Sequence, residues 1–339
     1  LRHFSDKQVP EYTNFLTSKG FRMFTTNGIE FVQMRAFLQR FLILYVTFIG
    51  LAVAALDASY GLLSPSERRA ALTEHIDLQF PDNKGSYPLA IILPGCMGWH
   101  PHHDRWRKEL LKREFAVLHV DSFAARGLNQ PTILRRDVCS GKTATGDERA
   151  GDIASVLPEV WKNKRIHEEK TVIMGWSHGG WTALDLLASL ESRISLPNLT
   201  QLPVLEVHNI RAAILYYPWC GPGGLNWTGY LPTNLQGYLF HGSRDAITSP
   251  KECKRRIKRA SKNGSRIEFV ELKGAFHWFD NHAAEFFDQK SHSIAFSRAI
   301  KLIKRVKNNK NNYPDDPANL TPPSGSDSLL DLFDDINEP

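Results

Sequence analysis

One short run of residues has the composition of an acyl-transfer site. Residues 171–184 read TVIMGWSHGGWTAL and contain the pattern G-x-S-x-G centred on Ser177. The pattern indicates a serine nucleophile when a strand precedes it and a helix follows, because the sharp turn then lifts the hydroxyl out of the sheet. Both elements are predicted here, the strand from the apolar run and the helix from His178 onward. Gly175 and Gly179 would remove Cβ atoms that collide where strand and helix pass each other. The alternative is a glycine-rich turn in which Ser177 only caps the helix.

A serine hydroxyl becomes a nucleophile only when a base removes its proton and an acid orients that base. Asp245 and His277 both come after Ser177 in the chain, each in a turn that follows a predicted strand. Ligand-binding groups of open parallel sheets gather at these carboxyl ends. We therefore expect His277 to be the general base and Asp245 to orient it. Asp121 also ends a predicted strand, but it precedes Ser177 and is better explained as a turn residue.

The negative charge of a tetrahedral intermediate requires two N–H donors. The backbone N–H of His178 lies at the start of the predicted helix and is one candidate. The second is expected in the loop Pro94-Gly95-Cys96-Met97-Gly98, which follows another predicted strand. We select the N–H of Cys96, with that of Met97 as the alternative one residue further along.

These groups are positioned by alternating elements between about residue 62 and residue 310. Short apolar runs predict strands, and amphipathic segments between them predict helices, the first of them capped by Asp104. Apolar strands that alternate with helices imply a mostly parallel sheet covered on both faces, in one α/β domain. The strands are expected at 89–93, 115–120, 171–174, 212–217, 237–240 and 267–271, and later helices at 146–161, from His178 and at 292–306.

Six motifs in a fixed order connect the sequence to a known family. They read PGCMGWHPHHDRW, VDSFAARG, GWSHGGW, YYPWC, HGSRDAITSP and GAFHWFD, and they fall within residues 85–305. Together they resemble the dienelactone hydrolase family of the α/β-hydrolase superfamily. The resemblance implies a single-domain α/β-hydrolase fold, the nucleophile Ser177 with Asp245 and His277, and oxyanion donors at Cys96 and His178. It implies ester or lactone hydrolysis without a cofactor. The namesake enzymes use a cysteine nucleophile, so Ser177 argues against dienelactone itself as the substrate.

Several large side chains flank the proposed site segments and are candidates for an apolar substrate pocket. They are Met97, Trp176, Trp181, Trp219 and Trp278. An ordinary role in the core is equally compatible with these residues. A metal is not expected, because no zinc-binding pattern accompanies the histidines at 100, 102 and 103, which we place in a loop beside the site entrance.

Two further functions stay open on the sequence. The fold does not secure the activity, so an exported binding protein that has lost catalysis is one alternative. A peptidase or acyltransferase with the same three side chains is the other. The expected partner is a small-molecule ester or lactone substrate, and a membrane tether through residues 41–56 stays possible. Nucleic acid is not expected, since the basic runs at 251–259 and 301–310 lack any nucleic-acid-binding motif and are interpreted as solvated helix faces.

Composition excludes several classes of protein. The chain has 339 residues, is 42% hydrophobic and 23% charged, and holds four cysteines. These values exclude disorder along the whole chain and a small disulfide-framework protein. Only one apolar run, residues 41–56, approaches the length of a membrane span, which excludes a polytopic membrane protein. The net charge is +6, and residues 314–339 contribute seven acids without a basic residue.

The two ends of the chain differ from the central domain. Residues 34–58 combine a basic start, an apolar run and small residues, in the order of a secretory signal. They are expected to be a cleaved signal peptide or a membrane anchor, which implies a periplasmic, secreted or outward-facing protein. Residues 1–33 are interpreted as a non-native or unstructured extension, 59–312 as the hydrolase domain and 313–339 as an acidic disordered tail. Export would allow the four cysteines to pair, and three complete pairings are possible.

Overall fold

A seven-stranded sheet forms the centre of the structure, a computed structural model in which residues 61–225 and 230–308 are described. The strand order is β1-β3-β2-β4-β5-β6-β7. All neighbouring pairs are parallel except β1 with β3. The strands are β1 (Ile76–Gln79), β2 (Tyr87–Leu93), β3 (Ala116–Val120), β4 (Ile166–Trp176), β5 (Ile210–Tyr216), β6 (Gln236–Gly242) and β7 (Arg266–Leu272).

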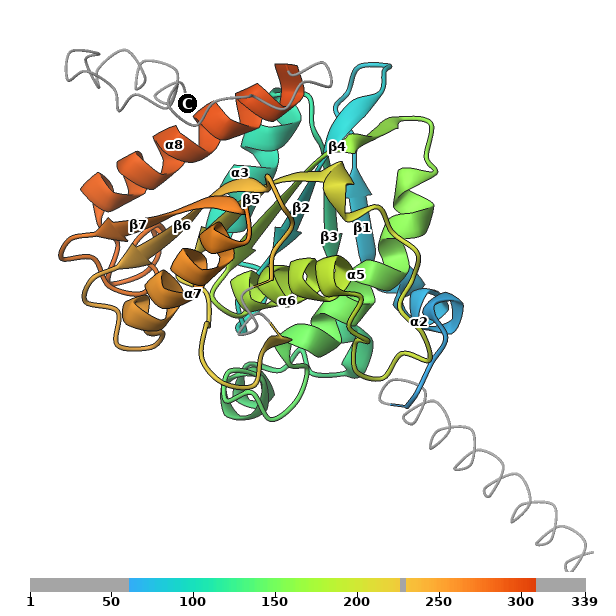
Figure 1. The fold of residues 1–339 in the computed structure, drawn as a ribbon, viewed down its shortest axis with the longest axis horizontal. Helices are drawn as coiled ribbons and strands as arrows, with labels where there is room; N and C mark the ends of the chain where they lie inside the picture. Colours follow the sequence, from blue (N-terminus) through green and yellow to red (C-terminus); the bar gives the residue numbers. More distant parts are fainter. Residues whose placement is uncertain (1–60, 226–229, 309–339) are drawn as a thin grey trace, which may run out of the picture. The chain divides into compact units, whose positions relative to one another are not determined.

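Helices cover the sheet on both faces (Figure 1). Side chains alternate between the faces along each strand, so Leu89, Ile91 and Leu93 of β2 pack with α2, α5, α6 and α7, whereas Ala90 and Ile92 pack with α3 and α8. The helices are α2 (Pro65–Leu72), α3 (Pro101–Lys112), α4 (Pro131–Ile133), α5 (Gly146–Trp161), α6 (His178–Ser192), α7 (Pro250–Lys262) and α8 (Gln289–Asn308). Shorter turns are η1 (Thr73–His75), η2 (Ala124–Arg126), the π-helical η3 (Leu134–Val138) and η4 (Val207–Asn209).

The predicted α/β class and parallel sheet are confirmed. Each of the six predicted strands is present, and the helix predicted at 146–161 has those bounds. The strand β1 was not predicted. It has only four residues, and all are half-buried, so it lacks the continuous apolar run that marks the buried parallel strands.

The predicted cap of the first helix after β2 is wrong. The helix α3 begins at Pro101, and its N-cap is His100, whose backbone N–H donates to Nδ1 of His103 at 2.9 Å. Asp104 instead lies within the first turn and accepts a hydrogen bond from the indole of Trp99. Proline is favoured at the first helical position because it has no N–H to leave unpaired, and Pro101 was the signal to follow.

The predictions for the segments 1–33, 34–58 and 313–339 lie outside the described residues. Within 61–225 and 230–308, no helix is both long enough and apolar enough to cross a membrane. The parallel arrangement of the sheet places the loops after β2, β4, β6 and β7 at one edge, where the candidate residues lie.

Candidate active site

Ser177 lies between the end of β4 and the start of α6, in a backbone conformation that L-residues rarely adopt. Its φ is 51° and its ψ is −112°. The turn is tight enough to require glycine on either side: a Cβ on Gly175 would lie 2.5 Å from the carbonyl oxygen of Gly179. A Cβ on Gly179 would lie 1.9 Å from the carbonyl oxygen of Leu93. The first contact is the strand–helix collision predicted from the sequence, and the second comes from β2, which the local pattern did not reveal.

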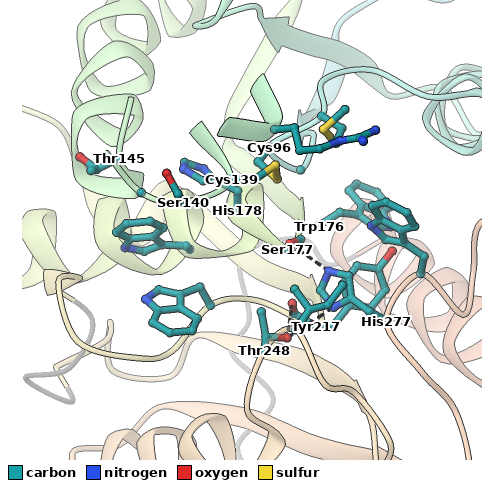
Figure 2. Close-up of a pocket in the computed structure, with 18 of the residues that line it drawn as sticks. Cys96, Cys139, Ser140, Thr145, Trp176, Ser177, His178, Tyr217, Thr248 and His277 are labelled. Carbon is teal, nitrogen blue, oxygen red and sulfur yellow. Dashed lines mark hydrogen bonds between the residues drawn. A yellow bond between two sulfur atoms is a disulfide. The ribbon is translucent and has the colours of Figure 1, made fainter. Parts of the chain in front are cut away.

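The structure brings Ser177, His277 and Asp245 together. Nε2 of His277 lies 3.0 Å from Oγ of Ser177, and Nδ1 lies 2.7 Å from Oδ2 of Asp245. All three side chains are buried. A carboxylate only accepts hydrogen bonds, so Nδ1 of His277 carries the proton and the lone pair of Nε2 faces the serine hydroxyl. Figure 2 shows the dashed contact between Ser177 and His277.

Asp245 is held in place by its own turn. Its Oδ1 accepts the backbone N–H groups of Ile247 and Thr248, at 2.8 and 2.9 Å. The hydroxyl of Thr248 lies 3.0 Å from Oδ2. Burial raises the pKa of the Asp245 carboxyl, but the hydrogen bond and charge of His277, the backbone N–H of Thr248 and the charge of His241 together outweigh it, and the pKa lies below its usual value. Asp245 is therefore ionised at neutral pH and fixes the tautomer of His277.

The proposed oxyanion donors lie on the two loops that flank Ser177. His178 is the first residue of α6, and Cys96 lies in the turn after β2. A Cβ on Gly95 would lie 3.5 Å from Cβ of Ser177, so this turn passes beside the serine. Among the hydrogen bonds of the described residues, neither the N–H of His178 nor that of Cys96 has an acceptor. Both N–H groups are thus available to an oxygen bound at Ser177.

A buried arginine links these two loops. Nη1 of Arg149, on α5, lies 3.1 Å from the carbonyl oxygen of Pro94 and 2.9 Å from Nδ1 of His178. Its guanidinium also lies 4.5 Å from the ring centroid of Phe123. Burial lowers the pKa of Arg149 to about 10, so the group stays positive at neutral pH. The only sequence signal for this residue was weak, a lone arginine among the small residues of a buried helix.

A cavity of about 550 Å³ opens beside Ser177. It is lined mainly by large apolar and aromatic side chains, with no aspartate or glutamate among the described lining residues (Figure 2). The structure places every predicted pocket residue on the wall of this cavity: Met97, Trp176, Trp181, Trp219 and Trp278. Tyr217 and Ile247 also line it and were not predicted. Arg135, which is exposed, is the one lysine or arginine on the described wall.

Tyr217 and Trp176 are fixed by a second buried carboxylate, Asp280. The hydroxyl of Tyr217 and the indole N–H of Trp176 each lie 2.6 Å from an oxygen of Asp280. The ring of Tyr217 packs 4.4 Å from that of His277. Asp280 thus supports the wall behind the histidine. The sequence contains one sign of this role, since Asp280 lies only three residues after His277.

The cysteines form two disulfides, Cys96–Cys139 and Cys220–Cys253. This is one of the three pairings that the sequence allowed. The first disulfide ties the turn that carries a proposed oxyanion donor to the residue after η3, and both of its cysteines line the cavity. The second ties the segment after β5 to α7.

The prediction that the histidines at 100, 102 and 103 lie in a loop at the site entrance is wrong for two of them. His102 and His103 lie in the first turn of α3, are buried and pack against Trp176, whereas His100 precedes the helix; all three line the cavity. Burial lowers the pKa of His102 and lowers that of His103 further. Within residues 61–225 and 230–308, no group of three or more His, Cys, Asp or Glu side chains is arranged to hold a metal ion.

Comparison with solved structures identifies hydrolases as the similar folds. A protein of Klebsiella pneumoniae subsp. pneumoniae MGH 78578, provisionally named a dienelactone hydrolase, has 14% identity and a TM-score of 0.53, over 68% of this chain and 99% of that one. Native esterase 2 of the Planctomycetes species Thermogutta terrifontis has 16% identity and a TM-score of 0.49, over 70% and 90%. The dienelactone hydrolase-like promiscuous phosphotriesterase P91, from metagenomic libraries, has 14% identity and a TM-score of 0.46, over 68% of this chain and 99% of that one.

Neither a protein-family model nor a curated protein sequence matches the chain. The assignment of the fold therefore rests on the order of the strands, the turn at Ser177 and the similarity to the Klebsiella structure. The described part of this chain has the α/β-hydrolase fold, similar to that of a dienelactone hydrolase-like structure, as its sequence motifs predicted.

Proposed function

We propose that this protein is a serine hydrolase that cleaves carboxylic esters or lactones through an acyl-enzyme. The observation that carries the proposal is the continuous chain of contacts from Ser177 through His277 to Asp245, with distances of 3.0 and 2.7 Å. The chain ends at a cavity suited to a small organic substrate. Ser177 also adopts a positive φ, a strained conformation that is common at active sites and that a serine with only a structural role would not need.

The reaction has two acyl-transfer steps. Oγ of Ser177 attacks the substrate carbonyl carbon while Nε2 of His277 takes the hydroxyl proton, and the carbonyl oxygen becomes an oxyanion. The N–H groups of His178 and Cys96 stabilise this oxyanion. The ester bond then breaks, and the leaving alkoxide takes the proton from His277. Water, deprotonated by the same histidine, attacks the acyl-enzyme. The bond between the acyl carbon and Oγ then breaks, the carboxylic acid leaves, and His277 returns the proton to Oγ of Ser177.

Charge is placed on both sides of the reacting atoms. The imidazolium that forms at His277 lies against the ionised Asp245. The oxyanion forms between the two loops that the positive Arg149 holds together. Because both charged groups are buried, they require little reorganisation when the transition state forms.

Labelling with a fluorophosphonate tests the nucleophile. The wild-type protein should be labelled and Ser177→Ala should not, while both should show the same unfolding temperature. Hydrolysis of short-chain p-nitrophenyl esters should be lost in Ser177→Ala and His277→Ala. Equal labelling of the wild type and Ser177→Ala would refute the assignment, and a protein that turns over no ester and is not labelled would favour the binding-protein alternative.

We also propose that the protein works in an oxidising compartment, by export or as a membrane-anchored protein. The pairing of all four cysteines as disulfides supports this. Alkylation of free thiols in the protein taken from its host, followed by mass spectrometry, should find no free cysteine. Four alkylated cysteines in the native protein would contradict the proposal.

A further inference from the structure

The side chain of His178 carries its proton on Nε2. Nη1 of Arg149 lies 2.9 Å from Nδ1 of His178, and a guanidinium can only donate hydrogen bonds. Nδ1 must therefore accept, which leaves the proton on Nε2. Burial and the neighbouring positive charge both lower the pKa of His178 well below its ordinary value, so the ring stays neutral.

Two buried N–H groups in this part of the pocket have no acceptor. Nε2 of His178 and Nε1 of Trp181 make no hydrogen bond with any other described residue. The two side chains are only 5% and 6% exposed, their rings lie 4.9 Å apart, and both line the cavity. An unpaired buried donor is destabilising, and two side by side indicate a position for an acceptor that the protein itself does not supply.

The indole of Trp181 cannot turn its N–H toward another partner without displacing its surroundings. A Cβ on Gly146 would lie 2.4 Å from the indole, which shows how closely the ring packs on the backbone of α5. The far edge of the ring lies near Gly141. The donor therefore has a fixed direction, as a specificity-determining group requires.

Neighbouring hydroxyls do not fill this role. Oγ of Ser140 donates to the carbonyl oxygen of Arg136, and Oγ1 of Thr145 donates to Asp147. Figure 2 shows Ser140, Thr145 and His178 on one side of Ser177, with His277 and Thr248 on the other. The side of the pocket away from the histidine base thus offers two N–H donors and hydroxyls whose hydrogens are already used.

We propose that His178 and Trp181 form a subsite that binds an oxygen acceptor of the substrate, such as an ether, carbonyl or hydroxyl oxygen. Trp181 is one helical turn beyond Ser177, and one turn rises about 5.4 Å. The subsite therefore lies beside the scissile carbonyl carbon and not at it. The inference rests on the proposed hydrolase function and narrows the substrate class to oxygen-substituted esters or lactones.

The test compares esters that differ by one atom. In p-nitrophenyl esters, each methylene from the third to the fifth position of a straight acyl chain is replaced in turn by an ether oxygen. A second series of acetate esters carries the same replacement in the alcohol part. Because these esters release no coloured product, their hydrolysis is measured by titrating the released acid in a pH-stat. For each position, kcat/KM of the ether ester is divided by kcat/KM of the hydrocarbon ester. This ratio is then divided by the ratio of the two rate constants for hydroxide-catalysed hydrolysis, which removes the difference in intrinsic reactivity and gives the corrected ratio.

Trp181→Phe removes the N–H and keeps an aromatic ring, and Trp219→Phe is the matched control. Trp219 lines the same cavity, but its N–H is already bound to the carbonyl oxygen of Pro222 at 3.1 Å. We expect the corrected ratio to exceed one for at least one position in the wild type. It should fall about 3- to 10-fold in Trp181→Phe and stay unchanged in Trp219→Phe, with both variants folded by circular dichroism.

The outcomes separate the two proposals. If the wild type hydrolyses the esters but the ratio equals one at every position, or if Trp181→Phe does not lower it, the donors hold only water and the subsite does not exist. The wild-type series gives this answer even if Trp181→Phe does not fold. If no ester is hydrolysed and Ser177 is not labelled, the hydrolase function fails, and the subsite inference fails with it.

Discussion

Replacing Asp245 by asparagine should inactivate the protein while leaving the fold almost unchanged. The two backbone N–H groups of Ile247 and Thr248 point at Oδ1, so the carbonyl oxygen of the new amide would take that position. The amide NH₂ group would then occupy the position of Oδ2, 2.7 Å from Nδ1 of His277. An NH₂ group donates, so it stabilises the His277 tautomer with the proton on Nε2. That N–H faces Ser177 and cannot accept its proton.

The magnitude follows from the tautomer. Enzymes with this arrangement lose about 10⁴-fold in kcat when the acid becomes an amide, which corresponds to about 5 kcal/mol in the barrier. Stability should fall by only about 1–2 kcal/mol, because a hydrogen bond to a charged group becomes one between neutral groups. The Thr248 hydroxyl can redirect its hydrogen to the carbonyl oxygen of Tyr217, 3.2 Å away, and accept from the new NH₂ group.

Stopped-flow hydrolysis of p-nitrophenyl acetate would measure the acylation rate, and urea denaturation would measure stability. Asp245→Ala is the informative comparison, since it leaves His277 able to adopt either tautomer and should be no slower than Asp245→Asn. Asp280→Asn is the control: this carboxylate is also buried beside the site, but its hydrogen bonds go to Trp176 and Tyr217. Its kcat should fall far less than that of Asp245→Asn, because the tautomer of His277 is unchanged. The reasoning would be refuted if Asp245→Asn kept more than about a tenth of the wild-type kcat, or if Asp280→Asn lost as much.

Three further predictions concern the loops and the buried charges. Arg149→Met should lower kcat about 10- to 100-fold with a smaller change in KM, because both oxyanion loops lose their shared contact; a change confined to KM would contradict it. The double variant Cys96→Ala/Cys139→Ala opens a sequence separation of 43 residues and should lose about 4 kcal/mol of stability by denaturation. Its kcat should also fall, whereas removing Cys220–Cys253 should cost similar stability and spare kcat; equal kcat values for the two would argue against a role for the first disulfide. Acid should destabilise the fold between pH 6.5 and 4, by about 2–3 kcal/mol for each of the three histidines whose pKa burial lowers to about 4, His119, His241 and His292. The reason is that the unfolded chain binds protons in this range that the folded chain does not. Denaturation at pH 7, 5.5 and 4 would measure this, and constant stability would contradict it.

The elements that could be predicted are those whose signal is local. The strand before Ser177 is a continuous apolar run, and the segment from His178 onward is apolar enough to predict a buried helix, so their type and order followed from the residues themselves. The same holds for Asp245 and His277, because each follows a buried strand and the chain order of such sites is fixed. Their convergence at one edge is a property of parallel sheets, which the alternating pattern already implied.

The parts that could not be predicted depend on contacts between distant segments. Gly179 is required by the carbonyl of Leu93, which lies 86 positions earlier in the chain. Arg149 is explained by its contacts with Pro94, Phe123 and His178, none of which is adjacent to it in the sequence. The disulfide pairing is likewise decided by which loops the sheet brings together. No periodicity records such contacts. The cap predicted at Asp104 is a different case, since Pro101 marks the first position of the helix by a local signal.

The two histidines beside Ser177 show how one residue type takes opposite roles. Asp245 accepts from Nδ1 of His277, which leaves a lone pair on Nε2 and makes that ring a base. Arg149 donates to Nδ1 of His178, which leaves a proton on Nε2 and makes that ring a donor. The sign of the buried charge behind each ring therefore decides what the ring offers to the pocket. Exchanging the charges would reverse both roles, so the buried carboxylate and the buried guanidinium are as necessary to the proposed chemistry as the serine between them.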